Sequence, residues 1–211
     1  MKKFLKAIAY GFAWCVSLLF NNVVLKGFRK FAELVNTANF RRSLKKCGKR
    51  TKIGRRNHFE HLKNVRIGSD FTACDGLWLG TYPKYANERY SPDVQIGNGV
   101  SLSRNCHIGA VGSVKIGNNV LMGSNILIND HAHGVSVNTD VPRTTLPLVT
   151  KGGIEIGDNV WIGDNVCILS GVTVGKNCII GANSVVTKSF PEEGLLIAGN
   201  PARVIRTMEK Q

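Results

Sequence analysis

The feature that most constrains this chain is a six-residue repeat of aliphatic residues in its C-terminal half. From residue 154 onward the repeat runs without a miss through Ile156, Ile162, Ile168, Val174, Ile180 and Val186. Neither the helical period of 3.6 residues nor the simple alternation of a strand predicts this spacing. A hexapeptide solenoid does, because each short strand points one aliphatic side chain inward and three such strands close one triangular coil.

The same spacing occurs earlier in the chain. Its members there are Ile96, Leu102, Ile108, Ile116, Met122 and Ile128, with weaker repeats at Ile53, Ile67 and Leu79. The eight-residue step from Ile108 to Ile116 predicts a two-residue bulge within Ala110–Ser113. Glycine follows the repeat position at 157, 163, 175 and 181, where we expect it to relax the corner backbone. We therefore predict an all-β solenoid over residues 51–190.

The predicted organisation has three parts: an N-terminal helical segment at 1–50, the solenoid at 51–190 and a C-terminal tail at 191–211. Two stretches interrupt the six-residue spacing, and we expect both to be loop excursions. Residues 80–93 are polar with several aromatics, and residues 129–153 form a longer protruding loop. Loops that leave a rigid scaffold commonly carry function, so these two are the first places to look for a site.

The positive charge of the chain is concentrated at one end. The net charge is +14, and residues 1–66 hold 17 Lys/Arg against two Asp/Glu, which leaves the remainder close to neutral. This distribution argues against nucleic-acid binding along the whole chain and for one local basic patch. The basic run lacks interleaved aromatics, so we expect no nucleic-acid partner.

The N-terminal segment also carries an uncharged apolar stretch. Residues 7–25 contain no charge and lie between lysines on both sides, a length at the lower edge of a membrane-spanning helix. Phe28, Phe31, Leu34 and Val35 then fall on one helical face. Two interpretations stay open: a helix packed on the body or on a neighbouring subunit, or an anchor whose basic flank contacts anionic lipid. In the second case the protein would be cytoplasmic and peripheral on the inner face of the cytoplasmic membrane.

Asp130, His131 and His133 open the long loop within the sequence DHAHG. A neutral imidazole there could take a proton from an acceptor hydroxyl or amine. Neighbouring side chains of an extended segment point opposite ways, so we do not expect Asp130 to orient His131. A zinc site that includes His107 is a weaker alternative, because two histidines only two residues apart do not match the spacing of the γ-class carbonic anhydrases.

Several motifs together resemble those of a known family. They are VWIG at 160–163, GANSVVTK at 181–188 and AGNPAR at 198–203, together with the DHAHG loop. The chain resembles the hexapeptide-repeat (left-handed β-helix) acyltransferases over residues 51–207, in their maltose/galactoside and polysaccharide O-acetyltransferase branch. The resemblance does not extend to residues 1–50. It implies a left-handed parallel β-helix, a homotrimer, and acetyl-CoA bound in a channel between adjacent solenoids.

The resemblance also implies roles for particular residues. His131 stands where the catalytic base is expected, and His133 is the alternative because the loop is shorter than in the galactoside enzymes. The residues expected to bind acetyl-CoA are Trp161, Asp164, Ala182, Thr187, Lys188, Arg203 and Arg206. Ser103 stands where the galactoside enzymes have an acceptor-contacting asparagine, and we expect Ser103 and Asp130 to contact the acceptor.

We therefore predict an acetyl-CoA-dependent O-acetyltransferase with a histidine general base. The acceptor would be a sugar hydroxyl, free or on a lipid-linked glycan, in bacterial surface-polysaccharide biosynthesis. No metal is required, because the thioester carbonyl is already electrophilic. Two alternatives stay open: acetylation of an antibiotic or amino-sugar amine, and a non-catalytic β-helix scaffold.

Overall fold

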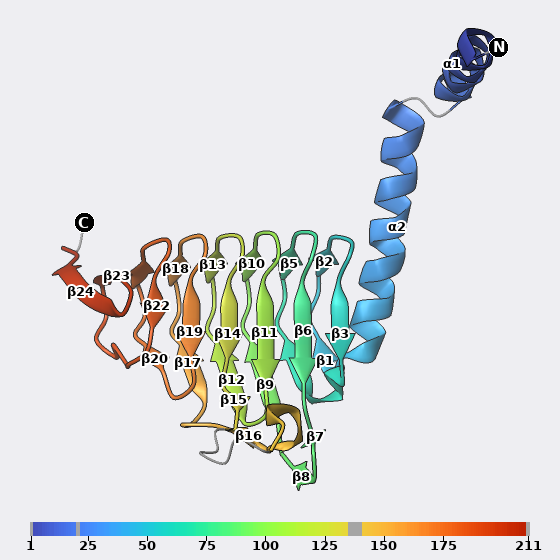
Figure 1. Cartoon of the computed structure of the whole chain (residues 1–211). Coiled ribbons are helices and arrows are strands. Elements are labelled where there is room, and N and C mark those ends of the chain that lie inside the picture. Colours follow the sequence, from blue (N-terminus) through green and yellow to red (C-terminus); the bar gives the residue numbers. More distant parts are fainter. Residues whose placement is uncertain (1, 20–21, 135–140, 210–211) are drawn as a thin grey trace.

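The computed structural model describes residues 2–19, 22–134 and 141–209 (Figure 1). Small parts of the predicted N-terminal segment, long loop and tail, at 1, 20–21, 135–140 and 210–211, lie outside these residues. Two helices, α1 (Lys2–Leu19) and α2 (Asn22–Ser43), precede a row of stacked coils. The coils form a prism with three flat sides, each of which is a sheet.

The three sheets are named here A, B and C in the order in which the chain visits them. Sheet A contains β1 (Lys46–Cys47), β4 (Val65–Ile67), β9 (Asp93–Ile96), β12 (Ser113–Ile116), β17 (Ile154–Ile156) and β20 (Thr173–Val174). Sheet B contains β2 (Lys52–Ile53), β5 (Thr72–Ala73), β10 (Ser101–Leu102), β13 (Leu121–Met122), β18 (Trp161–Ile162), β21 (Ile179–Ile180), β23 (Leu195–Gly199) and β24 (Ala202–Thr207). Sheet C contains β3 (His58–Glu60), β6 (Trp78–Thr81), β11 (His107–Ala110), β14 (Leu127–Asn129), β19 (Cys167–Leu169) and β22 (Val185–Val186).

The six-residue repeat positions form columns inside the prism. In sheet C the column Leu79, Ile108, Ile128, Ile168 and Val186 is in direct register from coil to coil, and every member has 0% exposure. Burying an aliphatic side chain of this size contributes roughly 2 kcal/mol relative to leaving it exposed. The predicted left-handed parallel β-helix is therefore confirmed, and its core is the set of residues that the period singles out.

The glycines after the repeat positions have a different role from the predicted one. Neither Gly157 nor Gly163 has a positive φ. Instead, a Cβ on Gly157 would lie 2.5 Å from the backbone nitrogen of Lys176, and a Cβ on Gly163 would lie 2.6 Å from the backbone nitrogen of Ala182. These glycines are needed because the next coil passes too close for any side chain, so the prediction that they relax the corners is wrong.

Asparagines supply the left-handed corner conformation. Their φ angles lie between +55° and +59° at Asn119, Asn125, Asn159, Asn165, Asn177 and Asn183. Asparagine tolerates this region because its short amide finds local hydrogen bonds. The amides also stack: Asn125 donates to the Oδ1 of Asn165 at 2.9 Å, and Asn165 donates to the Oδ1 of Asn183 at 3.1 Å. This ladder of asparagine amides therefore ties one corner of each coil to the same corner of the coils above and below it.

The coils extend slightly beyond the predicted range at both ends. Strand β1 begins at Lys46 and pairs with β4, and β23 pairs in parallel with β21 within the predicted tail. The last turns of α2 close the first coil, where the buried Phe40 ring lies 4.8 Å from that of Phe59 and 6.2 Å from that of Phe71.

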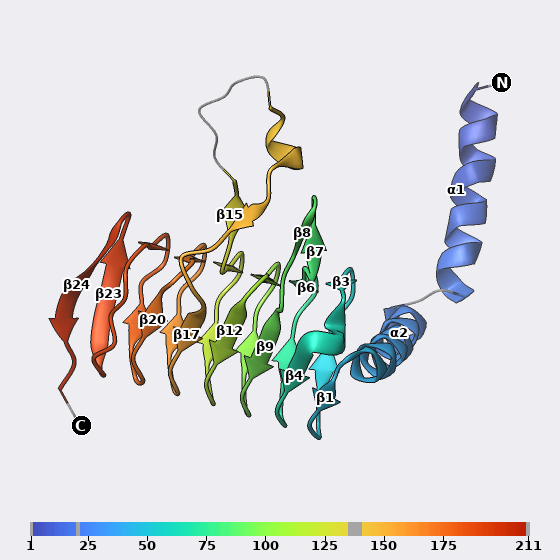
Figure 2. The ribbon, with the colours of Figure 1, turned by 90° about the horizontal axis from the view of Figure 1, so that it is seen from below.

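Helix α1 lies apart from the prism (Figures 1 and 2). Its large apolar side chains are exposed, with Phe4, Phe12 and Trp14 at 71%, 72% and 65%. Among the described residues, neither helix alone has the length and apolarity to cross a bilayer; Lys3–Leu19 and Val23–Ser43 meet that test only as a pair, bent by 61°. The described contacts between the N-terminal segment and the prism come from the last turns of α2, and both interpretations of the apolar stretch stay predictions.

Both predicted excursions leave the same edge of the prism, between sheets C and A. The first forms an antiparallel hairpin of β7 (Lys84–Tyr85) and β8 (Glu88–Arg89). The second pairs β15 (Ala132–His133) with β16 (Leu148–Val149) and includes a short 3-10 turn at Arg143–Thr145. A further turn at Leu62–Asn64 lies at this edge in the first coil. Figure 2 shows the two excursions projecting on the same side.

We expect Asn165→Ala to lower the free energy of unfolding by about 2 kcal/mol. The substitution removes two exposed ladder hydrogen bonds, each worth about 0.5 kcal/mol. It also replaces asparagine, whose amide makes the left-handed conformation tolerable, by alanine, which adopts it at a further cost of about 1 kcal/mol. Asn165→Gly is the matched control, since it loses the amide but keeps the conformation, and it should lose about half as much. Urea unfolding measures both variants, and an alanine variant as stable as wild type would contradict the ladder.

Candidate active site

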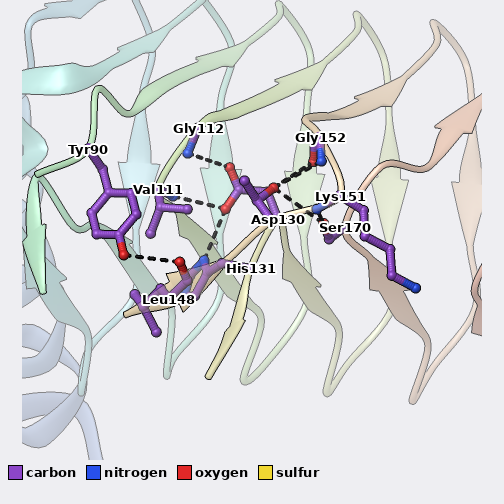
Figure 3. A network of polar contacts seen from close by, with 10 residues as sticks. Tyr90, Val111, Gly112, Asp130, His131, Leu148, Lys151, Gly152 and Ser170 are labelled. Carbon is purple, nitrogen blue, oxygen red and sulfur yellow. Dashed lines mark hydrogen bonds and ion pairs between the residues drawn. The ribbon is translucent and has the colours of Figure 1, made fainter. Parts of the chain in front are cut away.

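The centre of the candidate site is a buried carboxylate at the edge between sheets C and A. Asp130 follows directly after β14 and has 0% exposure. Its two oxygens accept hydrogen bonds from the backbone N–H groups of Val111 at 2.9 Å and Gly112 at 2.8 Å (Figure 3). Val111 and Gly112 are the two extra residues of the predicted bulge, so that insertion forms a cradle for the carboxylate of the next coil.

The same carboxylate orients the imidazole of His131. Oδ1 of Asp130 lies 3.0 Å from Nδ1 of His131. An ionised carboxylate only accepts, so Nδ1 carries the proton and Nε2 keeps a free lone pair. The expectation that Asp130 and His131 point apart is wrong, because side-chain alternation holds within a strand and β14 has already ended. The expectation that Asp130 contacts the acceptor is also wrong, since its oxygens are buried and engaged.

The ring of His131 lies in a confined position on the outer face of sheet C. Its side chain is 9% exposed, and the ring of Tyr82 meets it edge-on at 5.4 Å between centroids. A Cβ on Gly109 would overlap Oδ1 of Asn129 and lie 3.3 Å from Cε1 of His131. Glycine at position 109 therefore leaves room for the Asn129 amide and for the His131 ring. His107 lies nearby; burial lowers its pKa, and the charges of His131 and His58 lower it further.

The loop that carries His131 is fixed at two places where it returns to the prism. The Tyr90 hydroxyl donates to the carbonyl of Leu148 at 3.0 Å (Figure 3). At the return, the hydroxyls of Thr150 and Ser170 lie 3.3 Å apart, and the Gly152 N–H donates to the Thr150 hydroxyl at 3.0 Å. Burial, together with the charge of Glu60, raises the pKa of Tyr82, the tyrosine nearest the imidazole.

His133 occupies a more open position at the same loop. It is exposed on β15, and its Nδ1 lies 3.2 Å from the hydroxyl of Tyr85. Residues 82–90, here called the tyrosine hairpin, thus contact residues 129–134 and 141–153, here called the histidine loop, through three tyrosines. The sequence predicts a role in the site for none of the aromatics of residues 80–93. The regular six-residue spacing gives no information about contacts between two excursions.

The residues predicted to bind acetyl-CoA lie elsewhere in the same chain. Trp161 is exposed on β18, while Asp164 and Ala182 lie at the edge between sheets B and C. Ser103 lies at this edge too, and its hydroxyl is 2.9 Å from that of Ser124. Sheet C separates this edge from His131, so one chain does not bring the two groups together.

The remaining predicted residues lie toward the C-terminal end of the prism. Thr187 and Lys188 follow β22, with the Lys188 ammonium 5.5 Å from the Phe190 ring centroid. Arg203 and Arg206 lie on β24, both exposed, and the Arg203 guanidinium donates to the carbonyl of Ala202 at 2.8 Å. Asp164 accepts the Ser124 N–H at 2.5 Å, which gives this predicted cofactor residue a structural role as well.

Within residues 2–19, 22–134 and 141–209, no group of three or more His, Cys, Asp or Glu side chains is placed to hold a metal ion. The structure pairs Asp130 with His131 and Tyr85 with His133, which are separate contacts. The expectation that the reaction needs no metal stays a prediction.

Comparisons with known proteins agree with this architecture. The family model described as bacterial transferase hexapeptide (six repeats) matches residues 153–188. The putative lipopolysaccharide biosynthesis O-acetyl transferase WbbJ of Escherichia coli K12 is 34% identical over 68% of this chain and 71% of its own length. The galactoside O-acetyltransferase of the same organism is 38% identical over 64% of this chain and 63% of its own.

A solved structure shows the same fold. The N-acyltransferase AntD from Bacillus cereus, in a complex with coenzyme A and an amino sugar nucleotide, superposes with a TM-score of 0.67 and 19% identity over 82% of this chain and 89% of that one. Fold and relatives together define the class: the chain belongs to the hexapeptide-repeat acyltransferase family. Within that family it falls in the O-acetyltransferase branch, and it is an acetyltransferase.

Proposed function

We propose that this protein transfers the acetyl group of acetyl-CoA to a sugar hydroxyl of a surface polysaccharide or its lipid-linked precursor, with His131 as general base. The observation that carries the proposal is the 3.0 Å contact between His131 Nδ1 and the buried carboxylate of Asp130. It fixes the tautomer in which Nε2 is an acceptor. The name of the Escherichia coli lipopolysaccharide relative supports the class of acceptor.

The proposed reaction follows from this arrangement. His131 Nε2 takes the proton of the acceptor hydroxyl as its oxygen attacks the thioester carbonyl, and the C–S bond then breaks. The departing thiolate receives that proton from the imidazolium, so the imidazole is regenerated. Asp130 stabilises the transient imidazolium and keeps its orientation, and such a positioned base is worth on the order of 10²–10⁴ in rate.

The protein acts as a homotrimer in this proposal, with each site formed by two chains. The edge that carries His131 on one prism would face the edge that carries Ser103, Asp164 and Ala182 on its neighbour. Closed three-fold symmetry repeats the same pair of edges three times. The family resemblance supports this arrangement, and the separation of the two edges within one chain is its structural reason.

The first helix would hold the trimer at the inner face of the cytoplasmic membrane. Its exposed apolar surface would enter the bilayer interface, and the lysines and arginines that flank it would contact anionic headgroups, each contributing about 1 kcal/mol. A lipid-linked glycan presents its sugar at that surface, so the anchor would bring enzyme and acceptor together.

We expect His131→Ala to lower kcat by about 10²–10⁴-fold, because the substitution removes the proton acceptor. Acetyl-CoA binding by calorimetry and the trimer by sedimentation should be retained. His133→Ala is the comparison, and it should keep most of kcat because its Nδ1 contacts a tyrosine rather than a carboxylate. Near-normal turnover of the His131 variant would overturn the assignment.

Sites formed by two chains predict complementation between two inactive variants. His131→Ala removes the base at one edge, and Ala182→Trp blocks the other edge with a large side chain. Trimers that contain both kinds of chain, purified by two different tags after co-expression, should regain about a third of wild-type activity, since one of three interfaces is intact. Mixed trimers no more active than the two parents would exclude a shared site.

The membrane proposal is tested with the full chain. Leu5→Glu with Phe12→Glu should abolish flotation with vesicles of phosphatidylglycerol and phosphatidylethanolamine, because buried charge opposes insertion of the helix. The matched control carries the same two charges at Gln95 on the prism and Thr144 on the protruding loop, and it should float like wild type. Removing residues 1–35 should likewise move the protein to the soluble fraction of cells. Unchanged flotation of the helix variant would refute the anchor.

A further inference from the structure

We propose that the tyrosine hairpin and the histidine loop together form a subsite for a pyranose acceptor. In this subsite Tyr85 and His133 hold hydroxyl groups of the same sugar whose reacting hydroxyl is deprotonated by His131. The inference rests on the proposed function, because it names the groups that recognise the acceptor of that reaction. It also gives His133 a binding role in place of a catalytic one.

The two excursions contact one another at three successive points. The ring of Tyr82 meets that of His131 at 5.4 Å, the Tyr85 hydroxyl lies 3.2 Å from His133 Nδ1, and the Tyr90 hydroxyl bonds the Leu148 carbonyl at 3.0 Å. The contact farthest from the prism is also the most exposed of the three. The inner contacts therefore fix the hairpin, and the outer one leaves polar groups available to a ligand.

His131 and His133 are two residues apart, so their Cα atoms lie at most about 7 Å from each other, and their rings contact Tyr82 and Tyr85 of the same hairpin. This separation is comparable with the width of a pyranose ring. A sugar that presents one hydroxyl to His131 Nε2 would therefore place its other hydroxyls beside His133 and Tyr85. Tyrosine suits such a ligand, because its ring covers apolar C–H groups while its hydroxyl bonds polar ones.

The tautomers of the two histidines explain why a hydroxyl-rich ligand fits. The carboxylate of Asp130 fixes His131 with its proton on Nδ1, so Nε2 only accepts. Within the part of the loop that the structure describes, His133 contacts the Tyr85 hydroxyl, which can donate or accept. Nε2 of His133 is then a donor or an acceptor, and a hydroxyl group can bond either form.

The carboxylate beside the base is not available to the acceptor. Asp130 is fully buried, and both of its oxygens accept hydrogen bonds from the protein. The outer contact between the two excursions instead offers the Tyr85 hydroxyl and the His133 imidazole, which suit the hydroxyl groups of a sugar.

The test uses the full-length trimer with three methyl glycosides as probes: methyl β-D-galactopyranoside, methyl α-D-glucopyranoside and methyl N-acetyl-β-D-glucosaminide. Variants Tyr85→Phe and His133→Gln are compared with Tyr10→Phe, a matched control on the distant helix α1. Saturation-transfer NMR measures glycoside binding without turnover. Steady-state kinetics measure KM for glycoside and for acetyl-CoA, and acetyl-CoA hydrolysis without glycoside reports the base alone.

We expect each site variant to raise KM for the glycoside about three- to tenfold, the loss of one hydrogen bond. The kcat, the KM for acetyl-CoA and the hydrolysis rate should stay at wild-type values, and the control should change nothing. A variant that slows hydrolysis would make its residue part of the base and overturn the inference. If wild type acetylates the glycoside and the site variants keep its KM for that glycoside, the inference is overturned and the proposed function stands. A wild type that binds and acetylates no glycoside would overturn both.

Discussion

The stacking of parallel coils through backbone hydrogen bonds sets the spacing on which every other feature of this protein depends. Neighbouring strands lie about 4.8 Å apart, so each residue type meets the same environment once per coil. Aliphatic side chains then fill columns inside, glycines stand where backbones approach most closely, and asparagines take the left-handed corners. Because this spacing cannot stretch, extra residues have to leave the prism at an edge.

The candidate site consists of such extra residues. Insertions follow strands β6, β11 and β14, which belong to successive coils and lie side by side in sheet C. All three insertions leave at the edge between sheets C and A. The middle insertion is only Val111–Gly112, too short to protrude, and its N–H groups turn toward Asp130 of the coil after it. The longer insertions on either side meet above it through tyrosines and histidines. A regular scaffold thus places three irregular segments within contact distance.

The sequence predicts the regular coils of this structure well and the irregular insertions only in part. The columns could be predicted where the spacing is regular, since Ile168 and Val186 lie three six-residue steps apart, which is one full coil of a hexapeptide solenoid. The bulge could be placed as well, because an eight-residue step in a six-residue pattern requires two additional residues. The carboxylate that the bulge binds could not be predicted, because Asp130 turns inward only after its strand has ended. Contacts such as Tyr85 with His133 join residues of two aperiodic segments, and no spacing encodes them.

The two histidines of the loop show why environment, rather than residue type, decides a role. Both are imidazoles on one extended segment, and both contact a tyrosine of the same hairpin. Among the described residues, His131 contacts a carboxylate, and that carboxylate is itself held by two backbone N–H groups. The carboxylate fixes the imidazole of His131 in the orientation and tautomer in which Nε2 accepts a proton. His133 contacts a tyrosine hydroxyl instead, so its hydrogen-bonding capacity is better suited to binding than to proton transfer.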